Sequence, residues 1–191
     1  MCQNNPHNAD SYSFNANLGQ NTNLRNYMSC YEKSVNALYS KILERNIPID
    51  VDVYAIPMLF LMRHTIEIGL KINIKYLSQY SDKDYCLSKI FKCHSLSKLF
   101  DCFQGHFRTL IKYLDIETIN QKLVLEKQCK ELIEKLEIID PNGDAFRYPI
   151  NTEGNIIFDR ETTINLLAIK NLFDEAIKLL KYTEDVVNVE G

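Results

Sequence analysis

Apolar residues recur at intervals of three and four along most of the chain, which is the spacing of one face of an α-helix. Short polar or proline-containing stretches interrupt this pattern. It predicts helices over residues 23–46, 57–79, about 94–114, 116–139 and 159–187. We therefore expect an all-α fold, a bundle of four to five long helices, with Gly105 as a point where the third helix bends or splits.

Polar residues and prolines mark the expected helix ends. Asn46 and Pro48 end the first helix. Pro57 fits the first turn of the second helix, where a missing backbone N–H is tolerated. Asp115 and Asp159 are the expected N-caps of the last two helices, because a carboxylate there accepts hydrogen bonds from free backbone N–H groups.

The stretch before the last helix has a different pattern. Asp140 opens the sequence DPNG, which is rich in turn-forming residues, and the residues up to Pro149 are expected to be extended. A second turn over 151–155 precedes the short apolar run 156–158. This order predicts a small β-hairpin or an extended arm.

Length and composition favour one domain outside the membrane. The chain has 191 residues, of which 46% are hydrophobic, enough for one core. Residues 1–22 are rich in Asn and lack periodicity, so we expect a flexible N-terminal arm before a single domain over 23–191. The N-terminus lacks the basic start and apolar core of a secretory signal, and no apolar run approaches the ~18 residues that span a bilayer. We expect a cytoplasmic protein.

Charge and cysteine content narrow the chemistry. A net charge of −3 gives no general attraction for nucleic acid, so contact with RNA would need a local basic patch. Cys86, Cys93, His94, Cys102 and His106 could supply zinc ligands, but they form no CxxC or HxxxH pair. We therefore expect free thiols and no metal site. Glycine-rich phosphate loops are absent, and no cofactor is expected.

The second helix carries charges in its apolar stripe. Arg63 falls within the stripe, and with Glu67 and Lys71 it forms a ladder at i, i+4 and i+8. An unpaired buried charge costs several kcal/mol. Arg63 is therefore expected to be paired, solvated in a cleft, or in contact with another chain.

Three motifs resemble those of a known family. LFLMRHTIEIGLK, HSLSKL and DPNGDAFRYP resemble the FLYRHxxELxLK, HdLxxL and DpxsxxFRYP motifs of bacterial HEPN-like helical domains, and they lie between Pro57 and Gly154. The resemblance implies an RNA-directed protein of a toxin–antitoxin or antiphage defence system, working as a homodimer with a composite cleft. The family's ribonuclease signature places a histidine four to six residues after an arginine, and no arginine here has a histidine at that distance.

The motifs also suggest a site, with metal-independent endoribonuclease activity as one expectation. Histidine moves protons near neutral pH and arginine holds phosphate, so these side chains suit attack by a ribose 2′-hydroxyl. The candidate catalytic residues are Arg63, His64, Glu67, His94 and Arg147, and the candidate binding residues are Lys71 and Tyr148.

Two other readings stay open. The first is a catalytically inactive module that binds a partner protein or a nucleotide. The second is a structural homodimer in which the polar set only fixes packing. In that case Arg63 and Glu67 tie the arm to the bundle, Arg147 and Tyr148 satisfy Glu67, and Lys71 is a solvated edge residue.

Overall fold

The computed structural model describes residues 16–20, 23–83, 87–141 and 143–183. It confirms the all-α bundle: the described part contains no strand, and its only β pairing is an isolated antiparallel bridge between Ile150 and Ile156. The elements are η3 (Leu18–Gln20), α1 (Leu24–Arg45), α2 (Pro48–Leu77), α3 (Leu87–Lys92), α4 (Leu96–Ile111), α5 (Ile116–Ile139) and α6 (Leu166–Lys181). Most of the predicted N-terminal arm, residues 1–22, lies outside the described residues.

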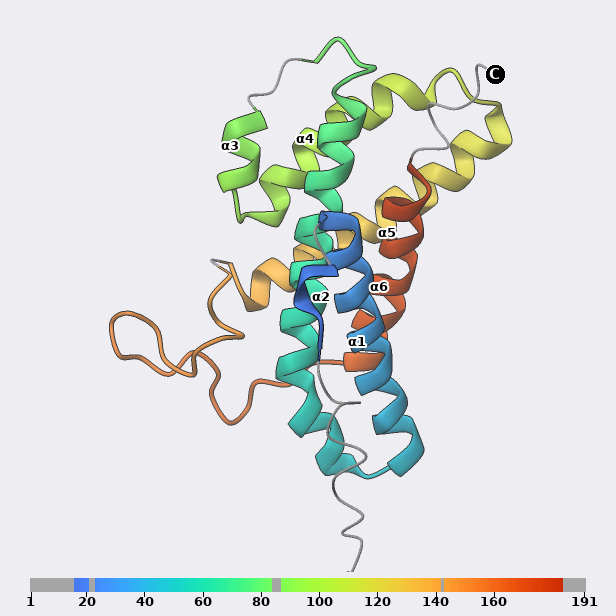
Figure 1. Cartoon of the computed structure of the whole chain (residues 1–191). Coiled ribbons are helices and arrows are strands. Elements are labelled where there is room, and N and C mark those ends of the chain that lie inside the picture. The colour runs from blue at the N-terminus through green and yellow to red at the C-terminus, as the bar shows by residue number, and fades with distance from the viewer. Residues whose placement is uncertain (1–15, 21–22, 84–86, 142, 184–191) are drawn as a thin grey trace, which may run out of the picture.

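Helix α2 is the centre of the bundle and packs against α1, α3, α4 and α6 (Figure 1). Helices α4 and α5 pack against each other, and α5 also packs on α6. The largest fully buried side chains come from these contacts and include Met58, Leu59, Met62, Phe103, Phe107 and Phe173. The segment between α5 and α6, residues 140–165 and called the arm from here on, projects to one side of the bundle (Figure 1).

Helix α2 begins at Pro48, so the prediction that Pro57 starts it is wrong. Pro48 occupies the first turn, and Pro57 lies inside the helix with its side chain exposed. A proline leaves the carbonyl four residues earlier without a partner. That residue is Val53, which is 58% exposed, so water can satisfy its carbonyl and the helix continues.

Other helix ends show which local signals prevailed. Asp115 caps α5, accepting from the Thr118 N–H at 2.9 Å, as predicted. The predicted cap Asp159 is wrong: it accepts from the Glu161 N–H and the Thr162 hydroxyl in a separate turn, and Asn165 caps α6 instead. Helix α6 ends at Lys181 rather than near residue 187, a position outside the described residues.

Two smaller features also differ from what the sequence predicts. Helix α4 runs through Gly105 as one element. The short helix α3 was not predicted.

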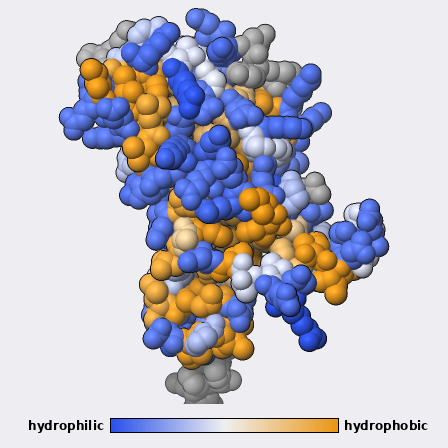
Figure 2. All heavy atoms as spheres, turned by 180° about the vertical axis from the view of Figure 1, so that it is seen from behind, coloured by the Kyte–Doolittle hydropathy of each residue, from blue (hydrophilic) through white to orange (hydrophobic). Residues whose placement is uncertain are grey.

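Helix α2 is long and apolar enough to cross a membrane by length and composition. The core helix of a bundle passes the same test, and more than half of the apolar window in α2 is buried against other helices. Apolar side chains also reach the surface at the turn between α1 and α2: Leu43, Ile47, Ile49 and Val53. Figure 2 shows apolar atoms over this lower end of the molecule and beside the arm.

Asn73 joins α2 to the end of α6. Its buried Nδ2 donates to the carbonyls of Gly69 and Leu180, each at 2.8 Å. Leu180 lies in the last turn of α6, where carbonyls have no partner within the helix. The helices approach closely here, since a Cβ on Gly69 would lie 2.8 Å from Leu180 Cδ1.

We expect Asn73→Ala to lower the free energy of unfolding by about 2 kcal/mol, because it leaves the Leu180 carbonyl buried without a donor. Urea denaturation measures the change. Asn36→Ala, on the exposed side of α1, is the matched control and should change stability by less than about 0.5 kcal/mol. Equal effects of the two substitutions would contradict the role given to Asn73.

Candidate functional site

A buried set of charges runs along α2. Arg63 Nη1 lies 3.4 Å from Glu67 Oε2, and Lys71 Nζ lies 2.7 Å from Glu67 Oε1. All three side chains are buried, so the reading of Lys71 as a solvated edge residue is wrong: it is 7% exposed. Lys71 also donates to the carbonyl of Phe91 in α3, at 3.2 Å. The ladder predicted from the sequence therefore exists and is turned into the protein.

Arg63 joins α2 to two distant segments. Its Nη2 donates to the His94 carbonyl at 2.9 Å, just before α4, and its Nε lies 3.3 Å from Asp140 Oδ2, where the arm begins. Asp140 Oδ1 accepts from the N–H groups of Asp144 and Ala145, closing the first turn of the arm. Arg63 thus ties the arm to the bundle, through Asp140 rather than through Arg147 or Tyr148.

Gly143 lies directly over the Arg63 guanidinium. Its φ is +80°, a conformation that L side chains rarely adopt, and a Cβ there would lie 3.0 Å from Arg63 Cζ. The position therefore needs glycine for two reasons. Its carbonyl accepts from Arg147 Nε at 3.0 Å, which places the Arg147 side chain beside Arg63.

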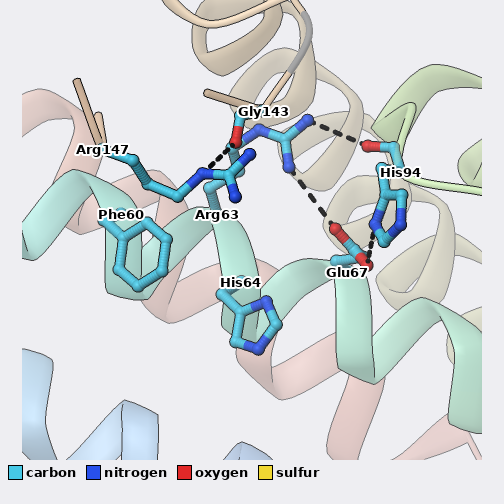
Figure 3. A pocket seen from close by; sticks show the side chains of 7 residues that line it. All are labelled: Phe60, Arg63, His64, Glu67, His94, Gly143 and Arg147. Carbon is cyan, nitrogen blue, oxygen red and sulfur yellow. Dashed lines mark hydrogen bonds and ion pairs between the residues drawn. The ribbon is translucent and has the colours of Figure 1, made fainter. Parts of the chain in front are cut away.

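A pocket of about 230 Å³ opens at this junction (Figure 3). It is lined by Phe60, Arg63, His64, Glu67, His94, Gly143 and Arg147. All five residues predicted as catalytic line it. Three of them come from α2, His94 comes from the link just before α4, and Arg147 comes from the arm. It is smaller than the roughly 300–1,000 Å³ of pockets that enclose drug-sized ligands, so it suits a compact group such as a phosphate.

The two residues predicted to bind lie elsewhere. Lys71 lies one turn further along α2 and contacts Glu67 without lining the pocket. Tyr148 is exposed, and its ring centroid is 5.9 Å from the Arg147 guanidinium carbon. The Glu67 carboxylate is held by Arg63, Lys71 and His94, not by Arg147 and Tyr148 as the structural interpretation expected.

The buried charges cancel. Arg63 and Lys71 are positive, and Glu67 and Asp140 are negative. Arg147 forms no ion pair within the described part of the chain, and its side chain is exposed at the pocket. The guanidinium of Arg147 is therefore the positive charge that the pocket can offer to an anion.

His64 and Glu67 have shifted pKa values. Burial lowers the pKa of His64, and the cations of Lys71 and Arg63 add to this effect against the opposing carboxylate of Glu67. Burial alone would raise the pKa of Glu67, but hydrogen bonds and charge from Lys71 and His94 lower it below its ordinary value. At neutral pH, His64 is thus neutral and Glu67 is ionised.

His94 and Glu67 form a carboxylate–imidazole pair. His94 Nδ1 lies 3.0 Å from Glu67 Oε1, and the His94 side chain is 68% exposed. An ionised carboxylate only accepts, so Nδ1 carries the hydrogen and donates it, which leaves Nε2 to exchange protons. The His64 ring is held between Phe60, stacked at 6.0 Å, and Tyr31, edge-on at 4.9 Å. The pocket can therefore hold an anion and move protons beside it.

Sequence reasoning missed Asp140, Gly143 and Phe60. Asp140 and Gly143 belong to the predicted DPNG turn, whose residue types indicate a turn but not what it contacts. Phe60 precedes His64 by one helical turn, a spacing that places the two rings together.

The cysteines and histidines weighed as zinc ligands do not converge within the described residues. No group of three or more His, Cys, Asp or Glu side chains there is placed to hold a metal ion. His94 pairs with Glu67, whereas His106 is buried with its Nδ1 against the Ser81 hydroxyl. Burial raises the pKa of the Cys102 thiol to about 11. Cys86 lies outside the described residues.

Comparisons with protein-family models, with curated proteins and with solved structures find no match to this chain.

We expect Arg63→Ala to lower the free energy of unfolding by about 3 kcal/mol, because the buried carboxylate of Asp140 loses its cation. Thermal and urea denaturation measure the loss. Lys130→Ala breaks an exposed pair with Glu134 and is the matched control, with an expected change below about 1 kcal/mol. If Arg63→Ala were as mild as the control, the guanidinium would not support the arm.

Proposed function

We propose that this chain is an HEPN-like, RNA-directed protein and that the pocket beside Arg63 is the active site of a metal-independent endoribonuclease. The observation that carries the proposal is that His64, His94 and Arg147 line one small pocket in different electrostatic settings. His64 is neutral, His94 is held by a carboxylate, and Arg147 has no ion-pair partner among the described residues.

These settings suit cleavage of a phosphodiester by the neighbouring 2′-hydroxyl. Neutral His64 accepts the proton of that hydroxyl, and its oxygen forms a bond to phosphorus. The bond from phosphorus to the 5′-oxygen breaks, and the leaving oxygen takes a proton from protonated His94, whose charge Glu67 stabilises. Arg147 offsets the negative charge that develops on the phosphate oxygens. The products are a 2′,3′-cyclic phosphate and a free 5′-hydroxyl.

The family resemblance adds the biological setting to this proposal. HEPN-like domains with these motifs suggest a bacterial toxin–antitoxin or antiphage defence system, a cytoplasmic location and a homodimer. A dimer would bring two copies of the pocket into one composite cleft, which supplies a second histidine and arginine to the same RNA.

A second candidate function is a binding module that holds a nucleotide or a partner protein without cleaving it. It is favoured by the burial of Arg63 and Glu67 and by the ion pairs that they form inside the protein. In this alternative, only Arg147 and the two histidines contact the ligand. The contact between Glu67 and His94 then stabilises the fold and takes no part in chemistry.

The test is cleavage of a single-stranded RNA in EDTA by the wild type and by His64→Gln and Arg147→Gln. We expect wild-type cleavage and a loss of about 100-fold or more in each variant, from removal of the base or of the anion-holding group. Both side chains lie outside the buried ion set, so the variants should keep their fold, which circular dichroism checks. Arg160→Gln, an exposed arginine on the same arm, is the control and should cleave as the wild type does.

The products separate the two candidate functions. Fragments ending in a 2′,3′-cyclic phosphate, formed by the wild type and the control alone, support the nuclease. If RNA stays intact with every protein and Arg147→Gln weakens nucleotide binding, the nuclease is excluded and the binding module is supported.

The pH dependence tests the role of His64. A base must be unprotonated, and the His64 pKa is lowered, so the loss of kcat/KM that protonation of His64 causes as the pH falls should be centred below the ordinary histidine value of about 6.5. The measurement is single-turnover cleavage between pH 4.5 and pH 8, together with a stability check at each pH. A decline toward low pH that is centred at or above about 6.5 would rule out His64 as the base.

A further inference from the structure

A second cavity, called the arm hollow from here on, lies between α2 and the arm. It has a volume of about 280 Å³, and the buried side chains of Leu59 and Leu166 are among its lining. The described residues that line it are Val51, Asp52, Ala55, Ile56, Leu59, Ile139, Phe146, Phe158, Thr162, Thr163, Ile164 and Leu166. Nine of these twelve are apolar. A mostly apolar lining with a few polar groups is typical of sites that bind small molecules.

Two phenylalanines form the arm's side of the hollow. The rings of Phe146 and Phe158 stack with their centroids 6.2 Å apart and their planes 25° apart. Phe146 is only 6% exposed, although the four residues that follow it are all exposed. The arm therefore rests on the bundle at Phe146. An apolar group that enters the hollow packs against these rings and leaves water, which favours binding.

Asp52 is the one charged side chain among the described residues that line the hollow. It is exposed, and it forms no ion pair within the described part of the chain. Arg160 and Glu161 on the arm are exposed and do not line the hollow. An ionised carboxylate only accepts hydrogen bonds, so a ligand group that faces Asp52 must be a donor. A cationic donor is favoured further, because charge strengthens the hydrogen bond.

We infer that the arm hollow binds a small organic ammonium ion, with its apolar body against Phe146 and Phe158 and its ammonium group at Asp52. The volume lies just below the roughly 300–1,000 Å³ of pockets for drug-sized ligands, so it suits one ring with a short chain. Such a ligand contacts α2 and the arm at once. It also holds Phe146, the residue before Arg147, which lines the other pocket.

The inference does not depend on the proposed function. The pocket beside Arg63 and the arm hollow share no lining residue, and the only cation or anion that the described lining of the hollow offers is Asp52. A ligand of the hollow is thus an organic cation, whereas a ligand of the pocket is an anion held by Arg147. The two sites can be tested separately.

The test is an amide NMR titration with three probes of one shape: phenylbutylamine, which is protonated at neutral pH, phenylbutanol and phenylbutyrate. We expect the amine to bind about tenfold more tightly than the carboxylate, because Asp52 attracts one and repels the other. Asp52→Asn should bring the two affinities within about twofold of each other. Asp101→Asn, which removes an exposed carboxylate on α4, is the matched control and should keep the preference.

A second variant tests the apolar part of the site. Ala55→Met places a longer side chain in the hollow without removing a packed group, and methionine is a good helix former. It should weaken binding of the amine and of the alcohol about tenfold or more. Ala37→Met, at an exposed position of α1, is the matched control and should bind both as the wild type does. Thermal melts check that all four variants are folded.

The positions of the shifted signals locate the ligand. Signals of Phe146, Phe158 and Ala55 that move with the amine, in the wild type and both controls but not in Ala55→Met, support the site whether or not any protein cleaves RNA. Shifts confined to His64 and His94 would place the probe in the other pocket and overturn the inference. Equal affinity for the three probes, or no binding, would also overturn it. So would a dimer, seen by sedimentation velocity, that Ala55→Met dissociates, because a second copy would then cover the hollow.

Discussion

The buried guanidinium of Arg63 is the constraint on which the rest of the structure depends. A charge in the middle of a helical bundle is tolerated only when its partners are fixed around it. Here those partners come from three places: Glu67 on the same helix, the His94 carbonyl before α4, and Asp140 at the start of the arm. Satisfying one side chain therefore brings together segments that are far apart in the sequence, and the pocket is the space left where they meet.

The same cations set the protonation of the pocket. Lys71 lowers the pKa of Glu67 by hydrogen bonding and charge, and Lys71 and Arg63 also lower the pKa of His64. Structural and chemical roles thus coincide in these two buried residues. A buried ion pair is often a weak source of stability, but here it also keeps a carboxylate ionised and an imidazole neutral at neutral pH.

Local patterns in the sequence predicted those helix bounds that local interactions determine. The bounds of α1 and α5 follow from apolar periodicity and from the caps Asn23 and Asp115. The starts of α2 and α6 were predicted wrongly because each has two competing signals, Pro48 against Pro57 and Asp159 against Asn165. Arg63, His64 and Glu67 share a pocket because helical geometry places them together, whereas His94 and Arg147 were found only through the motifs. The burial of Lys71 and the contact of Asp140 depend on α3 and on the path of the arm, which no spacing in the sequence reveals.

The arm leaves the bundle at Asp140 and returns at Asn165, and only its first turn is fixed by Arg63. Beyond that turn it carries Arg147, the positive charge available to a ligand, on exposed backbone outside the helices. Evolution can therefore lengthen, shorten or recharge the outer part of the arm without disturbing the ion set beneath it. Such a separation lets the sequence of the outer arm diverge between lineages while the helical scaffold is inherited intact.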